Sequence, residues 1–63
     1  MTYKIKELRE KRKMTQTQLS EKSGVSRATI IKLENEENPE VEVGTLKSLA
    51  SALGVKIQSL FGQ

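Results

Sequence analysis

The side chains with the clearest chemical potential lie on one face of a short segment, residues 26–36. At roughly 100° per residue, a helix over this segment turns a guanidinium, an ammonium, an amide, a methyl group and a branched apolar group to one side. These groups belong to Arg27, Ala28, Ile31, Lys32 and Asn35. Ile30 and Leu33 point the opposite way. In the major groove of DNA, Arg or Lys reads guanine, Asn reads adenine and apolar groups meet the thymine methyl.

The alternative is that this polar face is only solvated, as on many surface helices. Ile31 argues against it, because a helix that needs only solubility usually carries a charge at such a position. The face therefore favours base-edge recognition in duplex DNA.

An enzyme is not expected from this composition. The 63 residues contain no His and no Cys, and all 8 acids are Glu. Paired carboxylates such as Glu36 and Glu40 could in principle exchange protons, but we expect them in an exposed loop with no pocket to shift their pKa values. The chain has no glycine-rich phosphate loop, and its carboxylates do not follow the spacing of an EF-hand. We therefore expect no catalytic residue, no metal and no cofactor.

A preceding helix must position the polar face. Thr15 and Gln18 form a T-x-x-Q capping box, which begins a helix that runs to about Ser23. Gly24 follows, and glycine best tolerates the left-handed conformation that ends a helix. Ser26 is then a second N-cap. Two helices joined by so short a turn cross steeply, which is the helix-turn-helix arrangement.

Three further helices complete an all-α domain over residues 1–63. The first is expected over about 3–13, with Thr2 as a candidate cap. Another is expected over about 44–53, where apolar residues recur at i, i+3, i+4 and i+7. A short fifth helix is expected over about 57–61. The pattern predicts one compact five-helix domain with an aliphatic core.

The charges are distributed unevenly around the total of +3. Residues 1–13 hold six Lys or Arg and two Glu, a net charge of +4, whereas residues 35–43 hold four Glu and no base, a net charge of −4. A basic element suits a polyanion such as DNA, because neutralised phosphates release counterions. Basic helix faces are also common in small soluble proteins, so the charge supports the helix-turn-helix interpretation without replacing it.

The distribution of apolar residues and the absence of Cys indicate the cellular compartment in which the protein is expected. No stretch approaches the roughly 20 apolar residues of a membrane span, and no apolar signal segment opens the chain. Without Cys there is no disulfide framework, so the helical core must stabilise the domain alone. We expect a cytoplasmic protein that does not enter a membrane.

Five segments together resemble a known family. They are LRE at residues 8–10, TQTQLSEKSGVSRATIIKLE at 15–34, the Asn38–Pro39 loop, LKSLASALGV at 46–55 and IQSLF at 57–61. In this order and spacing they are similar to the helix-turn-helix family of phage repressors and Cro proteins, also called the xenobiotic-response-element family. The resemblance covers residues 5–61 and implies a lambda-repressor-like domain, a sequence-specific DNA-binding transcriptional regulator, with a repressor favoured.

The resemblance implies roles for individual residues. Arg27, Ala28 and Lys32 match the positions that contact base edges, and Ile31 joins them from the same face. Contacts to the DNA backbone fall to Gln16, Ser26 and Thr29, and Asn35 and Asn38 could reach phosphate from the edges of the next loop. The two hydroxyls could instead serve only as local caps.

Arg9 and Glu34 match a pair that forms a largely buried salt bridge between the first and third helices of the family. We assign this pair a structural role, because removing one partner would leave a buried charge alone.

The acidic segment 35–43 departs from the family, in which the corresponding loop commonly offers Lys or Arg to phosphate. Two explanations stay open. A solvated loop would reduce non-specific DNA binding, and a docking surface would serve a basic protein partner, as in an antitoxin subunit or a restriction–modification controller. We favour the first.

A homodimer on a roughly palindromic operator is expected, because a single small helix reads too little sequence alone. The apolar residues available for a two-fold interface are Val55, Ile57, Leu60 and Phe61. Leu60 and Phe61 could instead close the core of the monomer, since so small a domain needs every large apolar residue.

Overall fold

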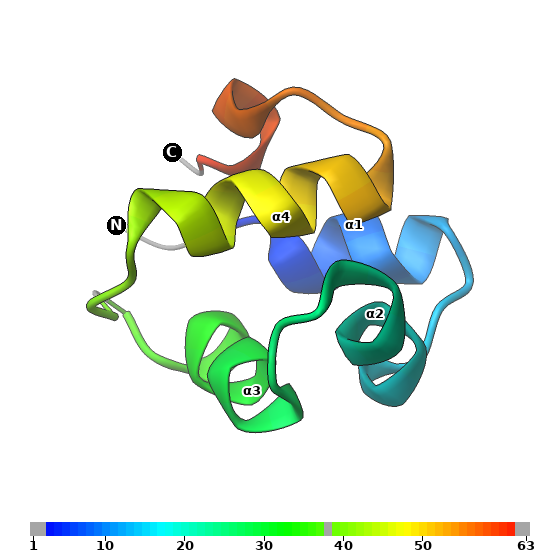
Figure 1. The fold of residues 1–63 in the computed structure, drawn as a ribbon, viewed down its shortest axis with the longest axis horizontal. Helices are drawn as coiled ribbons and strands as arrows, with labels where there is room; N and C mark the ends of the chain where they lie inside the picture. Colours follow the sequence, from blue (N-terminus) through cyan, green and yellow to red (C-terminus); the bar gives the residue numbers. More distant parts are fainter. Residues whose placement is uncertain (1–2, 38, 62–63) are drawn as a thin grey trace.

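The computed structural model describes residues 3–37 and 39–61. They form four α-helices and one short 3₁₀ helix: α1 (Ile5–Lys11), α2 (Gln16–Ser23), α3 (Arg27–Asn35), α4 (Val43–Leu53) and η1 (Ile57–Leu60). In Figure 1, α4 crosses in front of α1, α2 and α3 lie below it, and the 3₁₀ helix lies above. The expected all-α class is confirmed.

Local hydrogen bonds begin α2 as the sequence predicts. The Gln18 backbone N–H donates to Thr15 Oγ1 at 3.0 Å, and the Thr15 N–H donates to Gln18 Oε1 at 2.8 Å. This reciprocal box satisfies two donors that the helix itself cannot. At the other end Gly24 takes a left-handed conformation with φ of 76°. Ser20 Oγ then donates to the Val25 carbonyl at 2.7 Å, which closes the turn into α3.

One apolar core joins all five elements. The buried residues of this core are Ile5, Leu19, Ile30, Leu33, Leu46, Leu49, Ala50, Ala52, Leu53 and Leu60. Four of them are the predicted i, i+3, i+4, i+7 stripe of α4. Fully burying one Leu or Ile stabilises a fold by about 1.5–3 kcal/mol. A domain of this size therefore depends on each of them.

The first helix is shorter than the expected span of 3–13. At its start, Tyr3 forms an antiparallel bridge with Phe61, and the Lys4 N–H donates to the Leu60 carbonyl at 2.7 Å. Tyr3 and Lys4 therefore pair with the far end of the chain instead of extending α1. The candidate cap Thr2 lies outside the described residues.

The end of α1 is set by a Schellman motif. The Met14 N–H donates to the Arg9 carbonyl at 3.1 Å, and the Lys13 N–H donates to the Glu10 carbonyl at 3.0 Å. Lys13 occupies the left-handed position with φ of 57°. Gly54 fills the corresponding position after α4, with φ of 70°. Glycine accepts this conformation freely, whereas a residue with a side chain is strained in it.

The short fifth helix expected over about 57–61 is confirmed in part, because it is a 3₁₀ helix that ends at residue 60. Residues 57–60 form a 3₁₀ helix, in which the Ser59 N–H donates to the Lys56 carbonyl at 2.9 Å. Lys56 supplies no side-chain cap, and Phe61 is extended because it pairs with Tyr3. Four residues between these constraints complete no α-helical hydrogen-bond ladder.

Candidate nucleic-acid interface

The outer face of α3 presents the four side chains that were predicted to read bases, and with them Asn35, which was expected to reach phosphate. Arg27, Ala28, Ile31, Lys32 and Asn35 are all exposed, Ile31 by 36%. On the inner face, Ile30 and Leu33 are fully buried in the core. Burial on one side fixes the rotation of the helix, so the polar groups share one outward surface. A helix with such a face fits the dimensions of a major groove.

The hydroxyl groups at the start of α3 are already engaged with one another. Ser26 Oγ accepts the Thr29 backbone N–H at 3.2 Å and lies 2.9 Å from Thr29 Oγ1. These contacts make Ser26 the N-cap of α3. The local capping role left open for both hydroxyls is therefore present in the structure. Each hydroxyl oxygen can still take part in a further hydrogen bond, because it has two lone pairs.

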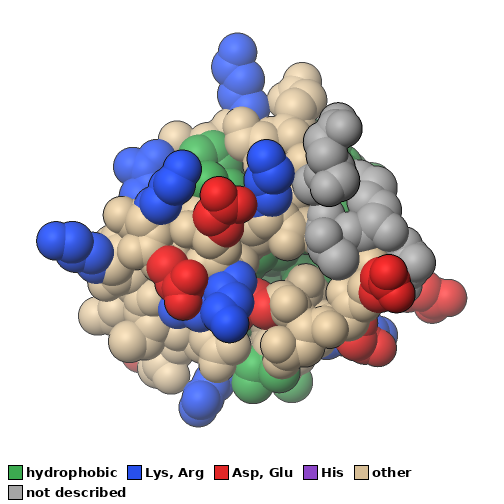
Figure 2. Space-filling model, turned by 180° about the vertical axis from the view of Figure 1, so that it is seen from behind, with side chains coloured by type: hydrophobic (Ala, Val, Ile, Leu, Met, Phe, Trp, Pro, Cys, Tyr) green, Lys and Arg blue, Asp and Glu red, His purple; other side chains and the backbone are tan. Residues whose placement is uncertain are grey.

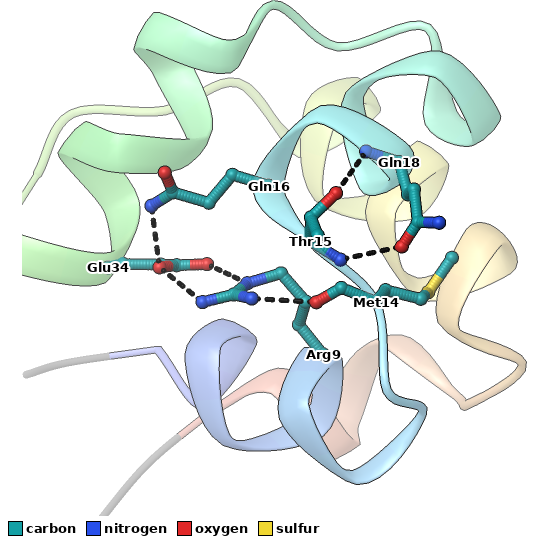
Figure 3. Close-up of polar contacts among 6 residues, drawn as sticks. All are labelled: Arg9, Met14, Thr15, Gln16, Gln18 and Glu34. Atoms are coloured by element: carbon teal, nitrogen blue, oxygen red, sulfur yellow. Dashed lines mark hydrogen bonds and ion pairs between the residues drawn. The ribbon is translucent and has the colours of Figure 1, made fainter.

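Arg9 and Glu34 form an ion pair that connects α1 to α3 (Figure 3). Arg9 Nε donates to Glu34 Oε2 at 2.8 Å, and Nη2 lies 3.3 Å from Oε1. Arg9 Nη1 donates to the Met14 carbonyl at 2.7 Å, just before the helix cap. The side chains are 12% and 2% exposed, respectively. The hydrogen bonds to Glu34 raise the pKa of Arg9 above its ordinary value, so the guanidinium stays charged.

The ion pair includes a third partner that the sequence did not predict. Gln16 Nε2, at the start of α2, donates to Glu34 Oε1 at 3.0 Å. The residue implied for DNA backbone contact is therefore attached to the pair that positions the helices. Eighteen positions separate the two residues, and no spacing pattern in the sequence signals their contact.

Comparison with known proteins identifies the fold. The family described as helix-turn-helix matches residues 5–60. The chain belongs to this family. The domain is 38% identical over 61 residues to the immunity repressor protein of Bacillus phage phi105, covering 95% of this chain and 41% of that protein. The resemblance to phage repressors drawn from the sequence is thereby confirmed.

Two similar proteins come from Bacillus subtilis (strain 168). The chain is 43% identical over 56 residues to the uncharacterized HTH-type transcriptional regulator RghRB, covering 89% of this chain and 40% of the relative. It is 41% identical over 56 residues to the HTH-type transcriptional repressor RghR, covering 89% and 42%. The chain thus spans about two fifths of the length of these relatives.

The acidic segment lies at the edge of the α3 face of this helix-turn-helix domain. Glu40 and Glu42 line a surface groove together with Lys32 of α3; Thr29, Val41 and Thr45 complete its walls. Figure 2 shows acidic side chains gathered at one edge of the molecule. Carboxylates therefore flank one of the cations implied for base reading. Asn38, the other residue proposed to reach phosphate from this loop, lies outside the described residues.

Basic side chains spread over the part of the domain that Figure 2 turns toward the reader. The exposed cations of the N-terminal segment are Lys4, Lys6, Lys11, Arg12 and Lys13. Arg12 also has a local position, because its guanidinium lies beside Gly54 at the end of α4. A cation there interacts favourably with the negative end of the helix dipole.

The four apolar residues proposed for a dimer interface differ in exposure. Leu60 is fully buried, so it closes the core of the monomer and offers no surface to a second copy. Phe61 is 38% exposed, and its ring lies 5.7 Å from the ring of Tyr3. Val55 and Ile57 are half-buried against the core. Three of the four thus keep some accessible apolar surface.

Residues 3–37 and 39–61 contain neither a cluster of metal-ligating side chains nor a membrane-spanning helix. No three His, Cys, Asp or Glu side chains there come together in a way that could hold a metal ion. No helix in the same ranges is long and apolar enough to span a bilayer.

Proposed function

We propose that this helix-turn-helix domain binds duplex DNA in a sequence-specific manner and regulates transcription, with repression as the favoured outcome. The observation that carries the proposal is the outer face of α3, where Arg27, Lys32 and Asn35 are exposed while the opposite side is locked in the core. Arg27 is the best candidate for a bidentate contact to guanine, and Ala28 and Ile31 for the thymine methyl. Similarity to proteins named repressors supports the proposal.

The proposed contacts to the DNA backbone come from both sides of this face. Gln16 lies at the positive end of α2, where a phosphate is stabilised by the helix dipole and by free backbone N–H groups. Asn35 ends α3 and is exposed. Ser26 and Thr29 can add hydroxyl contacts from the start of α3. These contacts orient the domain, whereas the base contacts determine which sequence it prefers.

We further propose that the domain acts as a homodimer on an operator with two half-sites about one helical turn apart. The surface proposed for the two-fold interface consists of Val55, Ile57 and Phe61. Phe61 is the strongest of the three because it is a large apolar side chain with 38% of its surface exposed. Sedimentation at increasing protein concentration, with and without operator, measures whether the copies pair alone or only on DNA.

The first test is selection of bound duplexes from a random pool at about 0.15 M salt, where non-specific charge contacts are already weakened. The proposal expects enrichment of an inverted repeat, and the spacing of its halves gives the dimer geometry. Arg27→Ala protein serves as the matched control, and it should lose the preference at one base pair in each half. A folded protein that enriches no sequence would overturn the proposal.

A specific observation favours a second candidate, a protein-docking role for the acidic segment. Glu36, Glu37, Glu40 and Glu42 are all exposed. Within the described part of the chain, the one ion pair is Arg9–Glu34, so these four carboxylates have no basic partner there. A basic protein could therefore dock on them, as in the antitoxin or controller interpretation. Failure to enrich DNA, combined with salt-sensitive binding to a basic partner, would favour this candidate.

A further inference from the structure

Gln16 is held by a carboxylate that is itself almost completely buried. Glu34 Oε1 accepts the Gln16 amide at 3.0 Å, while the Glu34 side chain is only 2% exposed. Arg9 holds the same carboxylate through Nε and Nη2 and anchors to the Met14 carbonyl through Nη1. The end of α3, the middle of α1 and the first residue of α2 thus share one hydrogen-bond network (Figure 3).

The chemistry of Glu34 determines which way the Gln16 amide faces. A carboxylate only accepts hydrogen bonds, so the amide nitrogen must face it and the amide oxygen must face away. Figure 3 shows this arrangement. The nitrogen carries two hydrogens, and Glu34 takes one of them. One N–H therefore remains, with its direction set by the bond to Glu34.

The remaining N–H lies at the start of α2. The leading backbone N–H groups of a helix have no acceptor within the helix, and this end carries a partial positive charge. A phosphate placed there can accept from the backbone and from the free amide hydrogen of Gln16 together.

We propose that Glu34 is a positioning residue for DNA binding: by accepting one hydrogen of the Gln16 amide, it pre-orients the other toward a DNA phosphate. This inference rests on the proposed function. It gives the Arg9–Glu34 pair a second role beyond stability, since the pair holds the carboxylate that aims Gln16. An unheld glutamine must be ordered when it binds, whereas this one is ordered beforehand. Immobilising one such side chain is worth about twofold to tenfold in affinity.

A double-mutant cycle tests the proposal on the highest-affinity duplex recovered from the random pool. The proteins are the wild type, Gln16→Ala, Glu34→Gln and the double variant, measured at a temperature where all are folded. Glu21→Gln is the matched control, because it removes the same charge from an exposed position on α2. Loss of a negative charge alone should leave DNA binding unchanged or slightly tighter.

The expected result is that Glu34→Gln weakens binding about twofold to tenfold in the wild-type background and has no further effect when Gln16 is already Ala. Equal losses in both backgrounds would overturn the positioning role while leaving the proposed function intact. If no duplex is enriched at all, the proposed function fails, and the inference falls with it.

A measurement on the unmodified protein covers the case in which Glu34→Gln does not fold. NMR relaxation of the side-chain amide groups compares Gln16 with Gln58, which is exposed on the 3₁₀ helix. The Gln16 amide should be as ordered as the backbone of α2, and Gln58 should be mobile on the ps–ns timescale. A Gln16 amide as mobile as that of Gln58 would refute the proposal without any DNA experiment.

Discussion

Replacing Arg9 by Ala should destabilise this small domain severely. The change removes three hydrogen bonds: two to Glu34 and one to the Met14 carbonyl. It leaves the Glu34 carboxylate, 2% exposed, with only the Gln16 amide as a partner. Breaking a buried pair in this way costs about 3–5 kcal/mol, because the remaining charge is neither solvated nor neutralised.

The size of the chain makes this loss decisive. At about 0.05–0.15 kcal/mol per residue, a domain of 63 residues has a free energy of unfolding of about 3–9 kcal/mol. A loss of about 3 kcal/mol lowers the Tm by about 12–24 °C, at about 4–8 °C per kcal/mol. Circular dichroism during thermal and urea unfolding measures both quantities. Lys6→Ala, an exposed change on the same helix, is the control and should alter the free energy of unfolding by less than about 0.5 kcal/mol.

Two further measurements separate the ion pair from general damage to α1. The double replacement Arg9→Met with Glu34→Leu should recover much of the lost stability, because apolar residues of similar volume need no solvation. The hydrogen bonds to Glu34 raise the pKa of Arg9 in the folded state, so its contribution to stability is complete below the ordinary pKa of arginine and is lost only as the pH rises through the higher folded-state value. Titration of Arg9 should therefore not change the free energy of unfolding of the wild type between about pH 6 and pH 9. An Arg9→Ala protein that melts like the Lys6 control would refute the reasoning.

Three other predictions address DNA contact and backbone strain. Arg27→Ala should cost about 1–3 kcal/mol on the selected duplex and relax the preference at one base pair, as measured by fluorescence anisotropy; an equal loss on random DNA would mean that Arg27 contacts only the backbone. Lys13→Gly should raise the free energy of unfolding by about 0.5–1 kcal/mol, because the relief of left-handed backbone strain exceeds the added entropy of the unfolded chain. The control Lys6→Gly, inside α1, should lower the free energy of unfolding by a similar amount. A change of the same sign in both variants would contradict the argument. The double variant Glu40→Gln, Glu42→Gln should bind random duplex DNA more tightly by about 0.5 kcal/mol per charge at low salt, and this gain should shrink as salt is added. Unchanged binding at every salt concentration would show that these carboxylates do not face DNA.

Local chemistry was the part of the fold most open to prediction from the sequence. The capping box at Thr15, the left-handed Gly24 and the cap at Ser26 depend on residues at most three positions apart, so their patterns are visible in the chain itself. The exposed face of α3 followed from helical periodicity in the same way. The pairing of Arg9 with Glu34 came from the family resemblance, because no local rule joins residues 25 positions apart.

The features that the sequence did not reveal depend on distant contacts. α1 starts late because Tyr3 pairs with Phe61 at the opposite end of the chain. The sequence does not mark the end of α1, because Lys13 occupies the left-handed position that is usually taken by Gly. The choice between core and interface for Leu60 needed the packed structure, which buries it completely. The attachment of Gln16 to Glu34 likewise requires two helices to be in place first.

The bridge between Tyr3 and Phe61 also makes this domain suitable for circular permutation. Residues paired across an antiparallel bridge lie about 4.5–5.5 Å apart at Cα, so a short glycine-containing linker could join residue 61 to residue 3 without moving either. New termini could then open between the exposed residues Glu36 and Glu37, where the backbone belongs to no helix. The same geometry would allow the domain to be inserted into a surface loop of a host protein, because the two junctions with the host would lie close together. A circular permutant of this kind would keep α1, α2 and α3 in one uninterrupted stretch while exchanging the order in which the two parts of the domain are synthesised.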